Sequence, residues 1–117
     1  MSFVRRNDER EVGRVKVQGG PGEVEMHKIL NNPGEMFGKG RLFNHIYAEP
    51  GAGVGWHIHH GDGEIYYILK GEGEYSDNGK LVTVRAGDVT FVGDGEGHSL
   101  VNTGHETLEA IALILYT

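Results

Sequence analysis

Hydrophobic and polar residues alternate with a period of two along much of the chain, which is typical of β-strands that turn one face toward a core. The segment 41–49 shows this pattern, with side chains on two alternate faces: Leu42, Ile46 and Ala48 on one, and Phe43, His45 and Tyr47 on the other. No window shows a convincing helical period of 3.6 residues. The pattern therefore predicts an all-β protein.

Further strand candidates follow one another at short intervals, at 14–17, 23–30, 54–59, 64–70, 71–76, 81–85, 89–92, 98–102 and 108–116. Between two of them stands Asn78-Gly79, the strongest short signal for a β-hairpin. Glycine accounts for 20 of the 117 residues without a collagen period, which indicates many tight turns. Short strands separated by such turns predict a β-sandwich or β-barrel.

The first residues differ in character from the rest. Residues 1–22 carry mixed charges and end in the breaker sequence GGPG, so we expect an N-terminal arm there. Residues 23–117 then form a single domain, and the chain length suits one modest core.

Composition narrows the classes of partner. The net charge of −6 argues against nucleic acid and anionic membrane surfaces as partners. The sequence has no apolar run of about 18 residues, and its beginning lacks the apolar core of a signal peptide. We therefore expect a cytoplasmic protein that contacts neither membranes nor nucleic acid. Cysteine is absent, so any bound metal must be held by histidine and carboxylate.

The segment GWHIHHGDGE, at 55–64, concentrates histidines and acids. His57 and His59 are two residues apart on a predicted strand and should face the same side. Glu64 begins the next strand and can add a carboxylate. Either His98, from a distant strand, or the nearby His60 can supply a third imidazole, although strand parity turns His60 away. Such a set suits Mn, Fe, Co, Ni, Cu or Zn better than Mg or Ca.

The spacing of these residues resembles the two motifs of the cupin family. The first motif, G-x5-H-x-H-x(3,4)-E-x6-G, is met at every position by Gly51, His57, His59, Glu64 and Gly71. The second motif, G-x5-P-x-G-x2-H-x3-N, is matched by four residues: Gly87, Gly95, His98 and Asn102. Gly93 stands where that motif has proline, which affects a turn and not a ligand.

The resemblance implies a jelly-roll barrel, also called a double-stranded β-helix, with His57, His59, Glu64 and His98 as ligands of a divalent transition metal (Mn, Fe, Ni, Co or Zn). The sequence is especially similar to small single-domain cupins that are called oxalate-decarboxylase-like. Four ligands leave an octahedral ion two open positions for a small-molecule ligand. Decarboxylation or oxidation of a small organic acid, or cleavage of a diol, would fit such a site.

Two other functions remain open. One is a non-catalytic module that binds a small metabolite. The other is a sugar isomerase or epimerase, which is disfavoured because the inward faces of the motif strands offer no obvious arginine or lysine for a sugar phosphate. Tyr66 shares parity with Glu64 and is the candidate proton donor or substrate contact, although packing in the core is the more common role of such a residue. His45 and Tyr47 can support the pocket from a neighbouring strand.

The last strand also predicts an oligomer. Its sequence LEAIALIL is very apolar, and the charged N-terminal arm is too polar to cover it, so a sheet of this size can bury its outer face only against a partner. We expect the outer face to be covered by a second copy in a homodimer.

Overall fold

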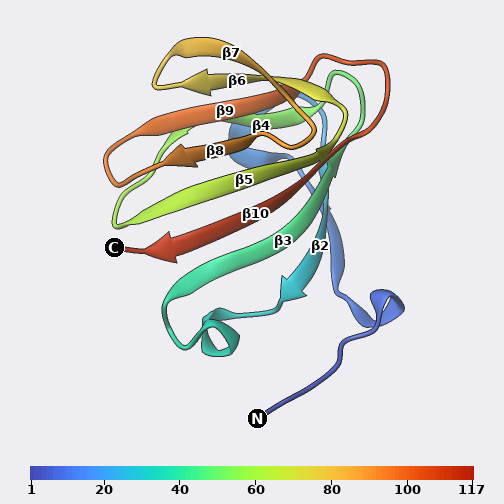
Figure 1. The fold of residues 1–117 in the computed structure, drawn as a ribbon, viewed down its shortest axis with the longest axis vertical. Coiled ribbons are helices and arrows are strands. Elements are labelled where there is room, and N and C mark those ends of the chain that lie inside the picture. The colour runs from blue at the N-terminus through green and yellow to red at the C-terminus, as the bar shows by residue number, and fades with distance from the viewer.

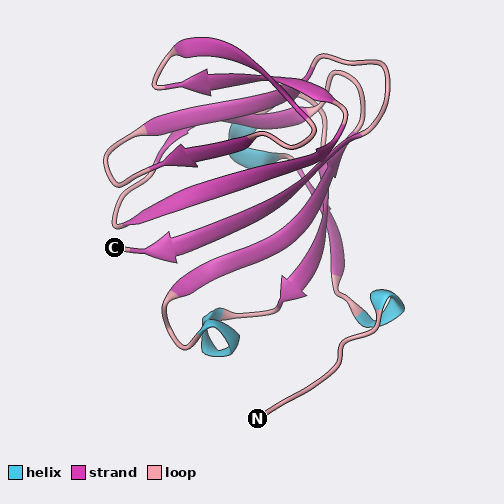
Figure 2. Cartoon of the chain, in the orientation of Figure 1, coloured by secondary structure: helices cyan, strands magenta, loops and turns pink.

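The computed structural model describes all residues from 1 to 117 and consists of ten β-strands and three short 3-10 helices (Figure 1, Figure 2). The strands are β1 (Val12–Val15), β2 (Val24–Leu30), β3 (Gly40–Ala48), β4 (Gly53–Ile58), β5 (Asp62–Lys70), β6 (Glu72–Asp77), β7 (Lys80–Arg85), β8 (Val89–Val92), β9 (Gly97–Asn102) and β10 (Leu108–Tyr116). The 3-10 helices are η1 (Asn7–Glu9), η2 (Val17–Gly19) and η3 (Pro33–Met36). The all-β prediction is confirmed.

The strands form two antiparallel sheets that face each other (Figure 1). The larger sheet has the order β1-β2-β3-β10-β5-β8, and the smaller has the order β4-β9-β6-β7. The hairpin expected at Asn78-Gly79 joins β6 to β7, and both residues have the positive φ angles that such a turn requires, 51° and 98°. No helix of the structure is long and apolar enough to span a membrane.

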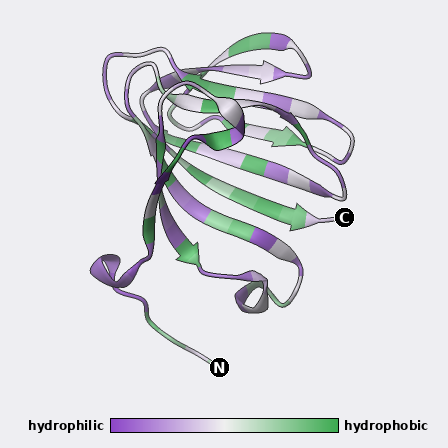
Figure 3. Ribbon diagram, turned by 180° about the vertical axis from the view of Figure 1, so that it is seen from behind, coloured by the Kyte–Doolittle hydropathy of each residue, from purple (hydrophilic) through white to green (hydrophobic).

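The core lies between the two sheets and takes alternate residues from the central strands, whereas the edge strand β1 has no buried residue. Val24, Ile46 and Ile68 of the larger sheet pack against Val54 and Leu100 of the smaller one in a cluster of 13 buried residues. Burial alternates along β10, as period two requires, yet most of its outer positions after Glu109 are also hydrophobic (Figure 3). This strand sits in the middle of the larger sheet, between β3 and β5.

The N-terminal residues contribute to the fold at two places. β1 pairs in register with β2 and becomes the edge of the larger sheet. Farther on, η2 lies on β4, and the backbones approach so closely that a Cβ added to Gly20 would stand 2.5 Å from the carbonyl oxygen of Gly53. Only glycine permits this contact. The segment before β2 therefore covers the beginning of β4, just ahead of His57.

Candidate metal site

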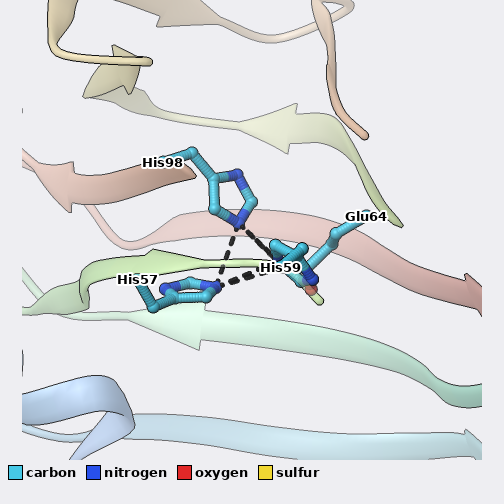
Figure 4. A group of neighbouring side chains, drawn as sticks. All are labelled: His57, His59, Glu64 and His98. Carbon is cyan, nitrogen blue, oxygen red and sulfur yellow. Dashed lines mark hydrogen bonds and ion pairs between the residues drawn. The ribbon is translucent and has the colours of Figure 1, made fainter. Parts of the chain in front are cut away.

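Four side chains converge between the sheets, namely His57, His59, Glu64 and His98 (Figure 4). The Nε2 atoms of the three histidines lie 3.1, 3.1 and 3.2 Å from one another. The Oε1 atom of Glu64 lies 3.0 Å from Nε2 of His98 and 3.3 Å from Nε2 of His59. The structure thus brings together the four residues that the sequence singled out, with His98 and not His60 as the third imidazole of the group.

Both sheets contribute residues to this group. β4 carries His57, and His59 follows directly after its end, so both face the core with the exposed Ile58 between them. In β9, His98 stands directly opposite His57 in the strand register. Glu64 comes from β5 in the larger sheet and reaches across the barrel. The site therefore depends on the packing of both sheets and not on one loop.

The outer nitrogen of each imidazole has its own partner. Nδ1 of His57 donates to the Gly55 carbonyl at 2.8 Å, and Nδ1 of His59 donates to Asp62 Oδ1 at 2.6 Å. Nδ1 of His98 lies 2.8 Å from the Tyr75 hydroxyl. With a proton on Nδ1, the neutral ring of His57 or His59 keeps a lone pair on Nε2, which points to the common centre. Partners of this kind orient histidines in metal sites.

The charges at the centre also suit a cation. Burial would by itself raise the pKa of Glu64, but the three surrounding imidazoles outweigh it and hold that pKa far below its usual range. The same carboxylate raises the pKa of His59, whereas burial lowers the pKa of His98. Glu64 therefore supplies an ionised carboxylate to a buried group of imidazoles.

These residues fit a transition metal. Bonds of about 2.1 Å to nitrogen bring neighbouring ligand atoms of one ion to roughly 3.0–3.4 Å from each other. The three nitrogen pairs have separations of 3.1–3.2 Å, within that range. Neutral nitrogen donors with one carboxylate are typical ligands of Mn, Fe, Co, Ni and Zn. The group His57, His59, Glu64 and His98 can therefore hold one such ion.

A cavity of about 170 Å³ opens beside the ligands and is lined mostly by hydrophobic side chains. Its walls include Leu42, Ile46 and Val54, together with Tyr66 of β5. The Tyr66 ring stacks on His98 with 5.2 Å between centroids and an interplanar angle of 9°. Complete burial, reinforced by the neighbouring Glu64, raises the pKa of Tyr66 well above its usual value, so its hydroxyl keeps its proton.

The sequence did not reveal several polar residues of the site. Asp62, the first residue of β5, accepts a hydrogen bond from His59 and another from Nε of Arg41 at 2.8 Å. Tyr75, in β6, is the hydrogen-bond partner of His98, and Gln18 of η2 lines the cavity. Asp62 lies three residues after His59, a spacing that could have suggested it. Tyr75 and Arg41 depend on strand pairings that no local pattern encodes.

His45 and Tyr47 were expected to support the pocket, and this expectation is wrong. Both lie on the outer face of the larger sheet, because Ile46 between them takes the inward position. There His45 lies 3.0 Å from Glu109 Oε1, and its Nδ1 lies 3.3 Å from the Tyr47 hydroxyl. His60 is exposed, as parity predicted.

The fold and the site together place the chain in a known class. The model of the cupin domain family matches residues 44–114, and the chain belongs to this family. The matched segment contains all four candidate metal ligands and every named position of both motifs. The expected jelly-roll cupin barrel is thereby confirmed.

Individual proteins and solved structures are also similar to this chain. The chain is 50% identical to the oxalate-binding protein of Thermotoga maritima over 114 residues, which are 97% of this chain and 93% of the relative. It is also similar to the crystal structure of a predicted oxalate decarboxylase from Thermotoga maritima, with a TM-score of 0.93, 46% identity and coverage of 98% and 100% of the two chains. The polyketide cyclase RemF of Streptomyces resistomycificus shares the fold, with a TM-score of 0.76, 18% identity and coverage of 99% and 80%.

The Tyr75 hydroxyl is expected to matter for metal affinity. Replacing Tyr75 with phenylalanine removes the partner of His98 Nδ1, and losses of this kind typically weaken metal binding about 10- to 100-fold. Competition with a fluorescent chelator measures this. Tyr67→Phe is the control, because Tyr67 lies half-exposed on the outer face. Equal affinities for both variants would mean that Tyr75 only fills the core.

Proposed function

We propose that this protein binds a divalent transition metal through His57, His59, Glu64 and His98 and uses it to bind and transform a small organic acid, by decarboxylation or oxidation. The observation that carries the proposal is the convergence of three oriented imidazoles and one ionised carboxylate beside a cavity of about 170 Å³. The oxalate-binding relative, at 50% identity, supports a small acid as the ligand over a diol or a sugar.

A metal bound there supplies Lewis acidity and open positions for a carboxylate. The chain supplies the surroundings. The apolar walls at Leu42, Ile46 and Val54 exclude water and so strengthen electrostatic interactions inside the cavity. Tyr66, the proposed catalytic residue, keeps its proton and lines the same cavity, where its hydroxyl can donate a hydrogen bond to a bound acid or hold a proton beside it.

Binding without turnover is the second candidate function, and the oxalate-binding name of the relative favours it. One experiment separates the two. Oxalate should raise the melting temperature of the metal-loaded protein and leave the chelated protein unchanged. Release of CO₂ or uptake of O₂ with oxalate would then identify an enzyme, and a thermal shift without either would identify a binding module. No shift with oxalate or any other small acid would contradict the proposal.

Under the enzymatic form of the proposal, Tyr66→Phe should lower turnover about 100-fold or more, as loss of a general acid does, without loss of metal. Tyr67→Phe, on the outer face, is again the control. A fully active Tyr66→Phe variant would assign Tyr66 to core packing.

We further propose a homodimer formed through the outer face of the larger sheet. Phe43, Leu113, Ile65 and Phe91 stand side by side across β3, β10, β5 and β8 in the strand register. Phe91 is 66% exposed, which is unusual for a large aromatic side chain in a continuous apolar row. A second copy of this face would cover the row.

Light scattering should therefore give twice the chain mass of 12.8 kDa at micromolar concentration. Phe91→Asp should shift the protein toward the monomer, since it places a charge within the row. Trp56→Asp is a control, because Trp56 is also half-exposed but belongs to β4 of the other sheet. A monomeric wild-type protein would contradict the proposal.

A further inference from the structure

One arginine lines the cavity beside the metal ligands, and no lysine does so. Arg41 stands at the beginning of β3, outside the two cupin motifs, and its side chain is 45% exposed. The rest of the lining is mostly hydrophobic, apart from the metal ligands, Tyr66 and Gln18. Arg41 is therefore the one permanent positive charge that a ligand in this cavity meets on the protein.

The guanidinium of Arg41 is held by a bond that leaves most of its donors available. Its Nε donates to Asp62 Oδ2 at 2.8 Å, while Oδ1 of the same carboxylate accepts from His59. The two Nη groups of Arg41 make no hydrogen bond to the chain, and paired donors of this kind match a carboxylate.

Gln18 provides a second polar group in the lining. It belongs to η2, and its backbone has a φ of 51° and a ψ of 38°, a left-handed conformation that a non-glycine residue rarely adopts. η2 packs closely on β4 at this point, because a Cβ added to Gly55 would stand 2.2 Å from the Gln18 carbonyl oxygen. Gln18 and Arg41, both exposed, thus line the same cavity.

We propose that Arg41 determines specificity by binding a second carboxylate of the ligand, so that the site selects small dicarboxylates over monocarboxylates. One carboxylate is held at the metal, and the other accepts hydrogen bonds from the Nη groups of Arg41. This inference rests on the proposed function, because it assumes that the metal site binds an acid. The connection through Asp62 fixes the guanidinium in place before the ligand arrives, which lowers the entropic cost of binding.

A purely structural role of Arg41 would not explain why its Nη groups are left free beside the cavity. Asp62 needs only its carboxylate to orient His59, and an ion pair with a half-exposed arginine adds little stability. The structural role predicts that loss of Arg41 weakens metal binding and affects all ligands alike. Recognition of a second carboxylate predicts a loss confined to dicarboxylates.

The test is calorimetric titration of the Mn²⁺-loaded protein with oxalate, malonate, succinate and acetate. Arg41→Gln should weaken the tightest-binding dicarboxylate about tenfold or more, which is the usual effect of losing charge-assisted hydrogen bonds. Its affinity for acetate should change less than about twofold, and its manganese content should equal that of the wild type. Arg14→Gln is the matched control, because Arg14 is 54% exposed and also paired with a glutamate, but on β1.

Each other outcome has a clear meaning. Unchanged dicarboxylate binding in Arg41→Gln overturns the inference, and so does an equal loss for acetate and dicarboxylates. Loss of manganese from Arg41→Gln, with normal dicarboxylate affinity once metal is restored, assigns Arg41 to positioning His59 and also overturns it. A wild-type protein that loads manganese but binds none of the acids overturns the proposed function itself, and the inference with it.

Discussion

Replacing His98 with alanine is expected to weaken binding of a transition metal about 100-fold or more. His98 Nε2 lies within 3.2 Å of the donor atoms of His57, His59 and Glu64, so the change removes a direct ligand from the centre of the group. Loss of a direct ligand should exceed the 10- to 100-fold typical of losing a supporting partner. Metal content of the purified, folded variant after dialysis measures the effect.

His60→Ala is the matched control. It changes the same residue type within three residues of His57, but His60 is exposed and follows the inward-facing His59. Its metal content should equal that of the wild type. If His60→Ala lost the metal while His98→Ala kept it, the strand-parity argument and the assignment of ligands would both be wrong.

Gly53→Ala should have the largest effect on stability. A Cβ at this position would stand 2.1 Å from the Leu100 carbonyl oxygen and 2.6 Å from Val101 Cα, both in the backbone of β9. The two strands would have to separate where their pairing begins, at a cost of about 3 kcal/mol or more. We expect the melting temperature to fall by roughly 10 °C or more.

The control for this change is Gly13→Ala in β1. An added Cβ there meets no atom within 4 Å, so the melting temperature should stay within a few degrees of the wild type. Because the β4–β9 pairing also sets His57 opposite His98, Gly53→Ala should weaken metal binding as well. Equal melting temperatures for the two variants would show that the backbone of β9 can shift at little cost to accommodate the added Cβ.

Strand parity explains why so much of the site could be predicted from the sequence. His57 and His59 are fixed on one face by a period of two, and the spacing of the second motif adds His98. The same rule predicted that His60 points away, and Asn78-Gly79 predicted a hairpin. These features depend on local geometry and motif spacing, which a sequence displays directly.

Other parts of the site depend on which strands become neighbours. Arg41 and Asp62 are 21 residues apart, and Tyr75 and His98 are 23 apart, so only the sheet topology brings them together. Parity within a strand also does not tell which of its two faces is inward. For this reason His45 was expected at the pocket, although the structure places it on the outer face of the larger sheet.

The metal site is tested most directly by anomalous diffraction from crystals grown with Mn²⁺ and oxalate. We expect one strong manganese peak per chain among Nε2 of His57, His59 and His98 and Oε1 of Glu64, with oxalate bound to the same ion. A manganese peak elsewhere, or no peak among these four side chains, would contradict the proposed metal site.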